Sequence, residues 1–418
     1  MSKRTFWIIV IVGILIAIGI VLFVFKSPKT PSDSLIDKVD EFMPFGNNKP
    51  SNIPKGQEQT TGDQGQNVTN ETTGEVKIPR LRLVSSMPIS GATTFEKIKV
   101  DGELKTSVTI ARYMARENGN VFEKSMDDFI ERTISKTIIP KINETFWGVD
   151  GSVALVRYLK NDIGPIQTFI GIVPKEIVGG DSKTDMRGDF MEENILGVTV
   201  KNDGLKSFHL LRHINGVVGI LMDLQTKKKT QVFDSAFSEW IPQWAGSKNI
   251  FLTTKPSYDV PGFLYDLNID TESFSKVLSG INGLTTNVSP DKKSLLYSNN
   301  QLELRVLDLA TKESKSLGIK TLPEKCQWSS DSVKAYCLVP KSIPATLNYP
   351  DDWYLGMISF NDNIFELDIK SNSGVLLPTG SVLAKKSIDG INPILDKDGH
   401  FLFFTNKIDG YLWAYTLE

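Results

Sequence analysis

Two cysteines, Cys326 and Cys337, have the spacing that most directly suggests covalent chemistry. They flank QWSSDSVKAY, in which a polar SSDS turn joins two strand-like stretches. Residues opposite each other across an antiparallel hairpin have Cβ atoms within about 5.5 Å, which is near the separation that a disulfide requires. The spacing predicts a disulfide in an oxidising compartment. The alternative is a pair of buried free thiols.

A second candidate is the insertion at 340–362, in which aromatic and acidic side chains gather within six positions. Loops that a rigid scaffold projects commonly carry binding function, and aromatic side chains combine an apolar body with a polar tip. Such a loop could hold a sugar, a peptide or a cation. We predict a binding loop made of Tyr349, Asp351, Asp352, Trp353 and Tyr354. The alternative is that Trp353 and Tyr354 pack the loop onto the scaffold.

A third segment, 175–194, is acidic and rich in glycine, and we expect it to be a solvated loop. It contains the tripeptide Arg187-Gly188-Asp189, which adhesion receptors can read. Its acidic residues lack the D-x-D-x-D-G spacing of a calcium loop. The segment therefore does not establish calcium dependence.

The chain carries no recognisable catalytic set. It has no G-x-S-x-G, H-E-x-x-H, Walker or G-x-G-x-x-G motif. Its three histidines, His209, His213 and His400, do not lie beside a nucleophile, and with two cysteines they do not form a four-ligand zinc pattern. We predict no catalytic residue, metal or cofactor. The formal net charge of −2 argues against a nucleic-acid partner.

The N-terminal segment predicts a membrane anchor. Phe6 to Phe25 is an uncharged run long enough to cross the hydrocarbon core as a helix. The alternative, a cleaved signal peptide, should have a shorter apolar core and a small-residue cleavage site. We expect residues 1–5 in the cytoplasm, a transmembrane helix at 6–25, and a disordered linker at 26–78, whose polar composition buries too little apolar surface to fold. The remainder, 79–418, is then extracytoplasmic.

The large domain reads as all-β. Short strand-like stretches such as SVALVRYL, NIFLTT and HFLFFT alternate with polar turns. The main exception is MDDFIERTI at 126–134, which has a helical period. An apolar anchor, a polar turn and a strand recur at intervals of 40 to 67 residues, which is typical of a β-propeller. The anchors, which we interpret as structural packing residues, are Trp147, Val200, Trp244, Val288, Trp328 and Leu395.

The turn Ser-Pro-Asp-Lys at 289–292, with NDG at 202–204 and DKDG at 396–399, resembles the SPDG-type turn of TolB-like, WD40-like (PD40) propeller repeats. This resemblance implies that each turn joins the innermost strand of a blade to the second strand. We predict seven four-stranded blades, with six or eight as alternatives. The first blade covers roughly 90–137. The last repeat lacks a fourth strand, which we expect residues 79–86 to supply.

The leading functional hypothesis is a membrane-anchored, extracytoplasmic module that binds a protein, peptide or glycan partner at the cell envelope. One alternative is a propeller enzyme, such as a glycosidase, lyase or hydrolase, with paired carboxylates at the central channel. The other is a purely structural envelope module. Neither the partner nor the oligomeric state follows from the sequence.

Overall fold

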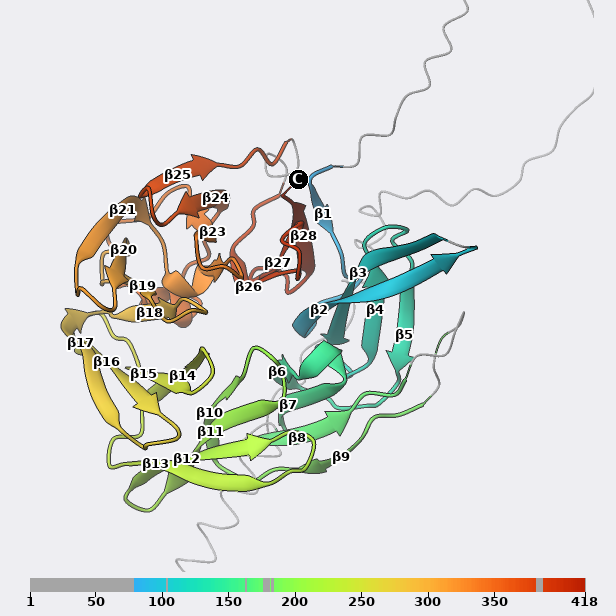
Figure 1. The fold of residues 1–418 in the computed structure, drawn as a ribbon, viewed down its shortest axis with the longest axis horizontal. Helices are drawn as coiled ribbons and strands as arrows, with labels where there is room; N and C mark the ends of the chain where they lie inside the picture. The colour runs from blue at the N-terminus through green and yellow to red at the C-terminus, as the bar shows by residue number, and fades with distance from the viewer. Residues whose placement is uncertain are drawn as a thin grey trace, which may run out of the picture. The chain divides into compact units, whose positions relative to one another are not determined.

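Seven four-stranded antiparallel sheets are arranged around a common axis in the computed structural model of this chain (Figure 1). The structure describes residues 79–417, apart from 103, 162–163, 176–180, 182–183 and 381–385. The predicted segments 1–5, 6–25 and 26–78 lie outside the described residues. Within the described ranges, no helix is long and apolar enough to span a bilayer. The seven sheets confirm the predicted β-propeller.

We number the blades in chain order, and each of blades 1 to 6 places its strands in sequence from the axis outward. Blade 1 consists of β2 (Ile89–Asp101), β3 (Leu104–Ala115), β4 (Val121–Ser125) and β5 (Glu131–Ser135). Blade 2 consists of β6 (Ile142–Trp147), β7 (Val153–Leu159), β8 (Ile166–Ile172) and β9 (Arg187–Phe190). Blade 3 consists of β10 (Ile195–Val200), β11 (Lys206–His213), β12 (Gly216–Asp223) and β13 (Lys229–Ser235).

Blades 4 to 6 follow the same pattern. Blade 4 consists of β14 (Trp240–Ala245), β15 (Asn249–Thr254), β16 (Pro261–Asn268) and β17 (Phe274–Asn282). Blade 5 consists of β18 (Thr285–Val288), β19 (Ser294–Ser298), β20 (Glu303–Asp308) and β21 (Ser314–Lys320). Blade 6 consists of β22 (Cys326–Trp328), β23 (Lys334–Pro340), β24 (Asp362–Asp368) and β25 (Ser373–Leu376). The helical elements that the structure describes are short: η1 (Val149–Gly151), η2 (Pro323–Lys325) and α2 (Asp351–Tyr354).

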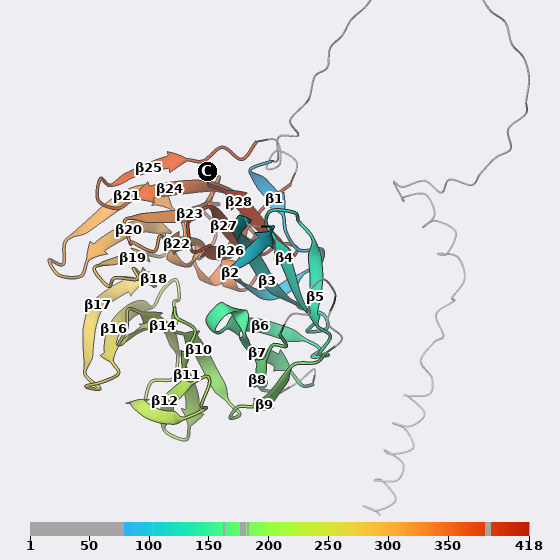
Figure 2. The same cartoon turned by 45° about the vertical axis from the view of Figure 1, so that its right-hand side comes forward.

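Blade 7 is completed by both ends of the domain. It contains β26 (Gly390–Leu395), β27 (Phe401–Asn406), β28 (Leu412–Thr416) and, as its outermost strand, β1 (Leu81–Leu83). Leu81 lies opposite Tyr415 in the antiparallel register, and β1 lies beside β28 in both views of the ring (Figures 1 and 2). The prediction that 79–86 supplies the missing strand is confirmed. This pairing covers the outer edge of β28 with the short strand β1.

The repeated turns lie where the family resemblance implied. The turn at 289–292 connects β18 to β19, and its Lys292 has a positive φ of 56°. The backbone N–H groups of Ser294 and Lys293 donate to Ser289 Oγ and Asp291 Oδ1, respectively. The side chains thus close the turn locally, as is typical of Asp and Ser in turns. The turns at 202–204 and 396–399 also join the first and second strands of their blades.

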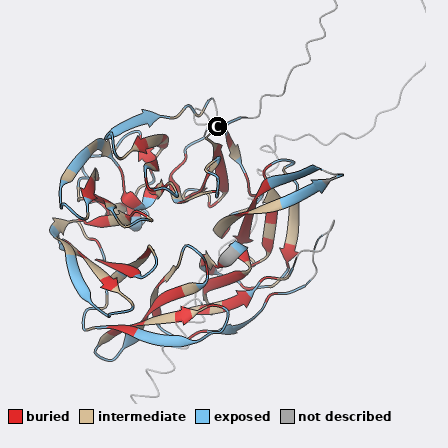
Figure 3. Ribbon diagram, viewed as in Figure 1, coloured by how far each residue is buried: buried red, intermediate tan, exposed pale blue. Residues whose placement is uncertain are grey.

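The core lies between neighbouring blades. One apolar cluster joins Phe208 of blade 3 to Trp244 and Ile250 of blade 4. Another joins Leu296 of blade 5 to Trp328 of blade 6. Burial is concentrated on the inner and middle strands, whereas outer strands such as β17 and β25 are exposed (Figure 3). This pattern is expected when twisted sheets stack face to face around an axis.

Two local expectations were wrong. Residues 126–134, which have a helical period, form a turn and enter strand β5. The tripeptide Arg187-Gly188-Asp189 is not part of a loop, because it belongs to β9 and pairs with β8. In both cases the fourth strand of a blade is needed at that position, and pairing with the third strand overrides the local pattern.

Candidate functional site

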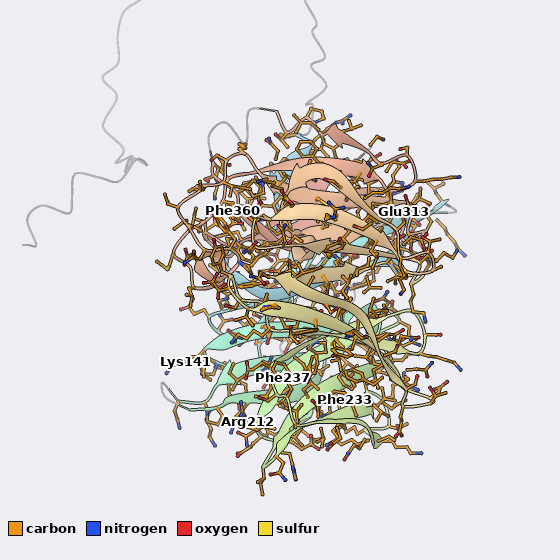
Figure 4. The ribbon with its side chains drawn as sticks, turned by 90° about the vertical axis from the view of Figure 1, so that its left-hand side faces the viewer. Lys141, Arg212, Phe233, Phe237, Glu313 and Phe360 are labelled. Atoms are coloured by element: carbon orange, nitrogen blue, oxygen red, sulfur yellow. A yellow bond between two sulfur atoms is a disulfide. The ribbon has the colours of Figure 1, made fainter. Side chains whose placement is uncertain are left out.

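The insertion 340–362 connects the second and third strands of blade 6 and folds across the ring. In an edge-on view, Phe360 from this insertion and Glu313 lie toward opposite faces (Figure 4). Helix α2 contacts other blades: Asp351 Oδ2 accepts a hydrogen bond from the backbone N–H of Tyr258 in blade 4 at 2.5 Å. Asp352 Oδ2 accepts one from the backbone N–H of Asn348 at 2.7 Å. Both predicted acidic residues therefore satisfy backbone donors.

The aromatic residues of the insertion divide into buried and exposed groups. Tyr349 and Trp353 are each 3% exposed and pack with Phe360, Leu302 and Leu322. The Trp353 and Phe360 rings are stacked, with centroids 6.2 Å apart. Tyr354 is 42% exposed. Of the predicted binding loop, Tyr354 is thus the aromatic side chain that a partner can reach.

A buried lysine holds this insertion in place. Lys325, at the end of η2, has its ammonium group 2.8 Å from Asp362 Oδ2 and also pairs with Asp389 Oδ1. All three side chains are buried. The rings of Trp353 and Phe360 each have their centroid 5.3 Å from Lys325 Nζ. A buried cation with two carboxylates and two aromatic neighbours is well compensated.

Asp389 binds the insertion directly, and Asp362 binds the first residue of β26. Asp389 Oδ2 accepts hydrogen bonds from Trp353 Nε1 at 2.9 Å and from the Phe360 backbone N–H at 3.0 Å. Asp362 Oδ2 accepts one from the Gly390 backbone N–H at 2.8 Å. Burial raises the pKa of Asp362 to about 6, although Lys325 acts in the opposite direction. We call Lys325, Asp362 and Asp389 the lysine cluster.

Beside the lysine cluster, a cavity of about 210 Å³ lies against the innermost strands of blades 4 and 5. We call it the central pocket. Glu324, the residue before Lys325, and Tyr354 of α2 both line it, and the Tyr354 hydroxyl donates to Glu324 Oε2 at 2.6 Å. The other lining residues are Ile241, Pro242, Gln243, Thr253, Pro256, Leu284, Thr285, Thr286 and Asn287.

Some polar side chains of the central pocket already have hydrogen-bond partners in the protein, whereas others can be reached by a ligand. Gln243 Nε2 donates to Asn287 Oδ1 at 3.1 Å, and Asn287 Nδ2 donates to the carbonyl of Cys326 at 2.7 Å. These amides fix the walls. Glu324 and Tyr354 instead combine solvent access with a surrounding wall of protein atoms. They are the groups available to a ligand.

The surroundings of Glu324 and Tyr354 shift the pKa of each group. Partial desolvation by the pocket wall raises the pKa of Glu324, against the effects of the Tyr354 hydrogen bond, Lys325 and Lys407. Partial desolvation of the hydroxyl, followed by the nearby Glu324 charge, raises the pKa of Tyr354. The Tyr354 hydroxyl is a donor and Glu324 is an acceptor. Such a pair can recognise a polar group of a ligand.

A second cavity, of about 330 Å³, lies against the inner strands of blades 1, 2, 3 and 7. The anchors Trp147 and Val200 line it, together with Glu144. Trp147 Nε1 is buried and has no hydrogen-bond partner in the described part of the chain. The remaining anchors lie on the inner strands β14, β18, β22 and β26, and Trp244, Val288 and Trp328 are buried.

Cys326 and Cys337 lie opposite each other on β22 and β23 and form a disulfide, with their Cα atoms 4.0 Å apart. Both residues are buried. The predicted disulfide is present, and it joins the strand that follows η2 to the strand that precedes the insertion. It therefore braces the two segments that carry Glu324 and Tyr354.

Sequence reasoning did not identify Glu324, Lys325, Asp362 or Asp389. The enzyme alternative required paired carboxylates at the central channel, and Asp362 and Asp389 do converge from separate elements. However, both are buried on one lysine. A lysine among apolar neighbours in the segment TLPEKCQW was the available signal, because a lysine is rarely fully buried unless it is paired.

No family profile and no curated protein sequence matches this chain. One solved structure with a similar fold is an oligogalacturonate lyase in complex with manganese: it is 11% identical, with a TM-score of 0.44, over 79% of this chain and 99% of that chain. Another is TolB from Acinetobacter baumannii, 12% identical, with a TM-score of 0.41, over 78% of this chain and 80% of that chain. These likenesses concern the fold alone. The blade order and the position of the SPDG-type turns agree with the TolB-like β-propeller that the sequence resembles.

Proposed function

We propose that this protein is a membrane-anchored, extracytoplasmic β-propeller that binds a peptide segment of an envelope protein in its central pocket. The observation that carries this proposal is the pairing of Glu324 and Tyr354 in a cavity at the inner strands. The rest of the insertion is packed so that Tyr354 stays there. A binding site on a rigid scaffold is more precisely held than one on a free loop.

The walls of the central pocket suit a peptide. Ile241, Pro242 and Leu284 provide apolar surface, and Glu324 provides an acceptor for backbone or side-chain N–H groups. A peptide presents both kinds of group in alternation. A volume of about 210 Å³ is smaller than most pockets for whole ligands, so it suits one or two residues of a longer chain.

Photo-crosslinking in the cells that produce the protein tests the site. A benzoylphenylalanine placed at Ile241, which lines the central pocket and is 44% exposed, should form a crosslink to one protein partner at a defined peptide. The same group at Ile214, an exposed apolar residue outside the pocket, is the control. No product at 241, or the same products at 241 and 214, would contradict the proposal.

Substitution of the polar pair adds a second criterion. Tyr354→Phe removes the hydroxyl but keeps the ring, and Glu324→Gln removes the charge but keeps the shape. Each should weaken the crosslink from position 241 at least fivefold, because a hydrogen bond to a charged group is worth about 1.5–3 kcal/mol. An undiminished crosslink in both variants would remove these residues from the site.

The membrane anchor requires its own test. The full chain should remain in the membrane pellet after alkaline carbonate extraction, and a chain lacking 6–25 should be released or secreted. Protease added on the extracytoplasmic side of the membrane should digest the linker 26–78 and release an intact propeller. Recovery of the full chain in the soluble fraction would contradict the anchor but leave the central pocket untouched.

A further inference from the structure

The lysine cluster joins three segments that lie far apart in the chain. Lys325 ends η2, Asp362 begins β24, and Asp389 immediately precedes β26. Each of the three side chains is at most 1% exposed. Burial of a cation and two carboxylates carries a large desolvation cost. The cluster therefore brings one amine and two carboxyl groups into direct contact in a place that bulk water does not reach.

The two oxygens of Asp389 have different partners. Oδ1 contacts the Lys325 ammonium group. Oδ2 accepts hydrogen bonds from Trp353 Nε1 at 2.9 Å and from the Phe360 backbone N–H at 3.0 Å. Two fixed N–H donors on one carboxyl oxygen are the arrangement that stabilises the oxyanion of a tetrahedral intermediate. Lys407 also interacts with the Asp389 charge, but its ammonium group donates to the carbonyl of Trp353, so Lys325 is the amine held against this carboxyl group.

Asp362 is placed to carry protons between these groups. Its Oδ2 lies 2.8 Å from Lys325 Nζ and also accepts the Gly390 backbone N–H. Its Oδ1 is buried and has no hydrogen-bond partner within the described ranges. Burial raises the pKa of Asp362 to about 6, although Lys325 acts in the opposite direction. A carboxyl group with a pKa near neutrality both accepts and releases protons readily.

We propose that Lys325 and Asp389 condense to an intramolecular isopeptide bond, with Asp362 as the proton carrier. A bond forms between Lys325 Nζ and Asp389 Cγ, and the bond from Cγ to Oδ1 breaks. The nitrogen loses two of its three protons, and both leave with Oδ1 as one molecule of water. Asp362 takes these protons from the nitrogen and delivers them to Oδ1, so it ends ionised, as it began. The amine and the carboxyl group are the complete set of reactants.

Two physical effects favour this condensation. Folding holds the amine against the carboxyl group, and well-oriented intramolecular reactions reach effective concentrations of about 10⁵–10⁸ M. The product also replaces a buried ammonium group and a buried carboxylate by a neutral amide, which lowers the cost of burying charge. The ion pairs of the lysine cluster hold the insertion until the bond forms. The bond then joins η2 covalently to the residue before β26, whatever the central pocket binds.

Mass spectrometry of the purified full chain, unfolded and with its disulfide reduced, tests this inference. The isopeptide bond lowers the mass by one water molecule relative to the sequence, and we expect this lower mass in most molecules. A tryptic digest should contain a branched peptide that joins the segments around Lys325 and Asp389, because trypsin does not cleave after an acylated lysine. The full mass of the sequence, together with ordinary peptides from both segments, would overturn the proposal.

Matched variants assign the roles. Lys325→Arg keeps a cation but removes the amine, so the water loss should disappear. Asp362→Asn removes the proton carrier and should slow bond formation by about a hundredfold or more; a cooperative unfolding transition shows that each variant is folded. Lys334→Arg, at the partly exposed pair with Glu366, and Tyr354→Phe, in the central pocket, should both keep the lower mass. The proposal would also be overturned by a water loss that persists in Lys325→Arg.

Discussion

The ammonium group of Lys325 lies 2.8 Å from the carboxylate of Asp362, and neither side chain reaches solvent. Asp389 completes the pair on the other side. Through Trp353 and Phe360 this cluster fixes the insertion of blade 6 over the ring. The charge of Lys325 therefore determines the position of Tyr354, which lies on the same short helix as Trp353.

Removing that charge should be costly. Lys325→Met leaves Asp362 and Asp389 buried without a cation, and breaking a buried pair in this way typically costs about 3–5 kcal/mol. We expect that loss in the free energy of unfolding from equilibrium denaturation. Lys334→Met is the matched control, because its pair with Glu366 is partly exposed and should be worth less than about 1 kcal/mol. Equal losses in the two variants would contradict the role of the lysine cluster.

Two buried groups should titrate with opposite effects on stability. Burial lowers the pKa of His209 from 6.5 to about 4, so its contribution is fully present above pH 6.5 and is lost as the pH falls toward 4. Burial raises the pKa of Asp362 from 3.8 to about 6. The contribution of Asp362 is therefore present below pH 3.8 and is lost as the pH rises through 6. In the wild type the two effects offset each other over nearly the same range.

Substitution should separate these two effects. Relative to wild type, His209→Gln should gain stability as the pH falls from 6.5 to 4, by up to about 3 kcal/mol at roughly 1.4 kcal/mol per pH unit. Asp362→Asn should instead lose stability more steeply on acidification. The measurement is equilibrium denaturation at several pH values. Slopes in both variants identical to that of the wild type would show that neither group is linked to folding.

The fold was largely predictable because each blade repeats one local pattern. The anchors and polar turns mark the first two strands of each unit, and the missing last strand indicated closure by β1. The insertion was not predictable in the same way. Trp353 is buried because its indole N–H meets Asp389, 36 residues later, and no local pattern encodes that contact. The helical period at 126–134 predicted the wrong structure for a similar reason, because the end of this segment pairs with β4 as part of β5.

The disulfide should contribute measurably to stability. Cys326 and Cys337 are separated by 11 positions, and in the chain-entropy treatment a loop of that size corresponds to about 3 kcal/mol. We expect the Cys326→Ala, Cys337→Ala double variant to lose stability of this order in the oxidised preparation. Reduction of the wild-type protein by a phosphine should bring its stability close to that of the variant. The disulfide would be contradicted if the reductant did not change the stability of the wild-type protein and a thiol-specific reagent modified both cysteines without prior reduction.

Ring closure by β1 can be tested by comparing a buried and an exposed leucine of this short strand. Leu81 is 1% exposed and packs with Tyr336, Leu338 and Tyr415, whereas Leu83 is 44% exposed. Leu81→Ala should lower the free energy of unfolding by about 2–5 kcal/mol, the usual cost for a buried leucine. Leu83→Ala should change it by about 0.5 kcal/mol or less. Deleting 79–86 should cost more than Leu81→Ala, since it also leaves the β28 backbone unpaired. If deletion leaves the thermal midpoint unchanged, the last blade does not depend on the first residues of the domain, and closure must be held by contacts between blades alone.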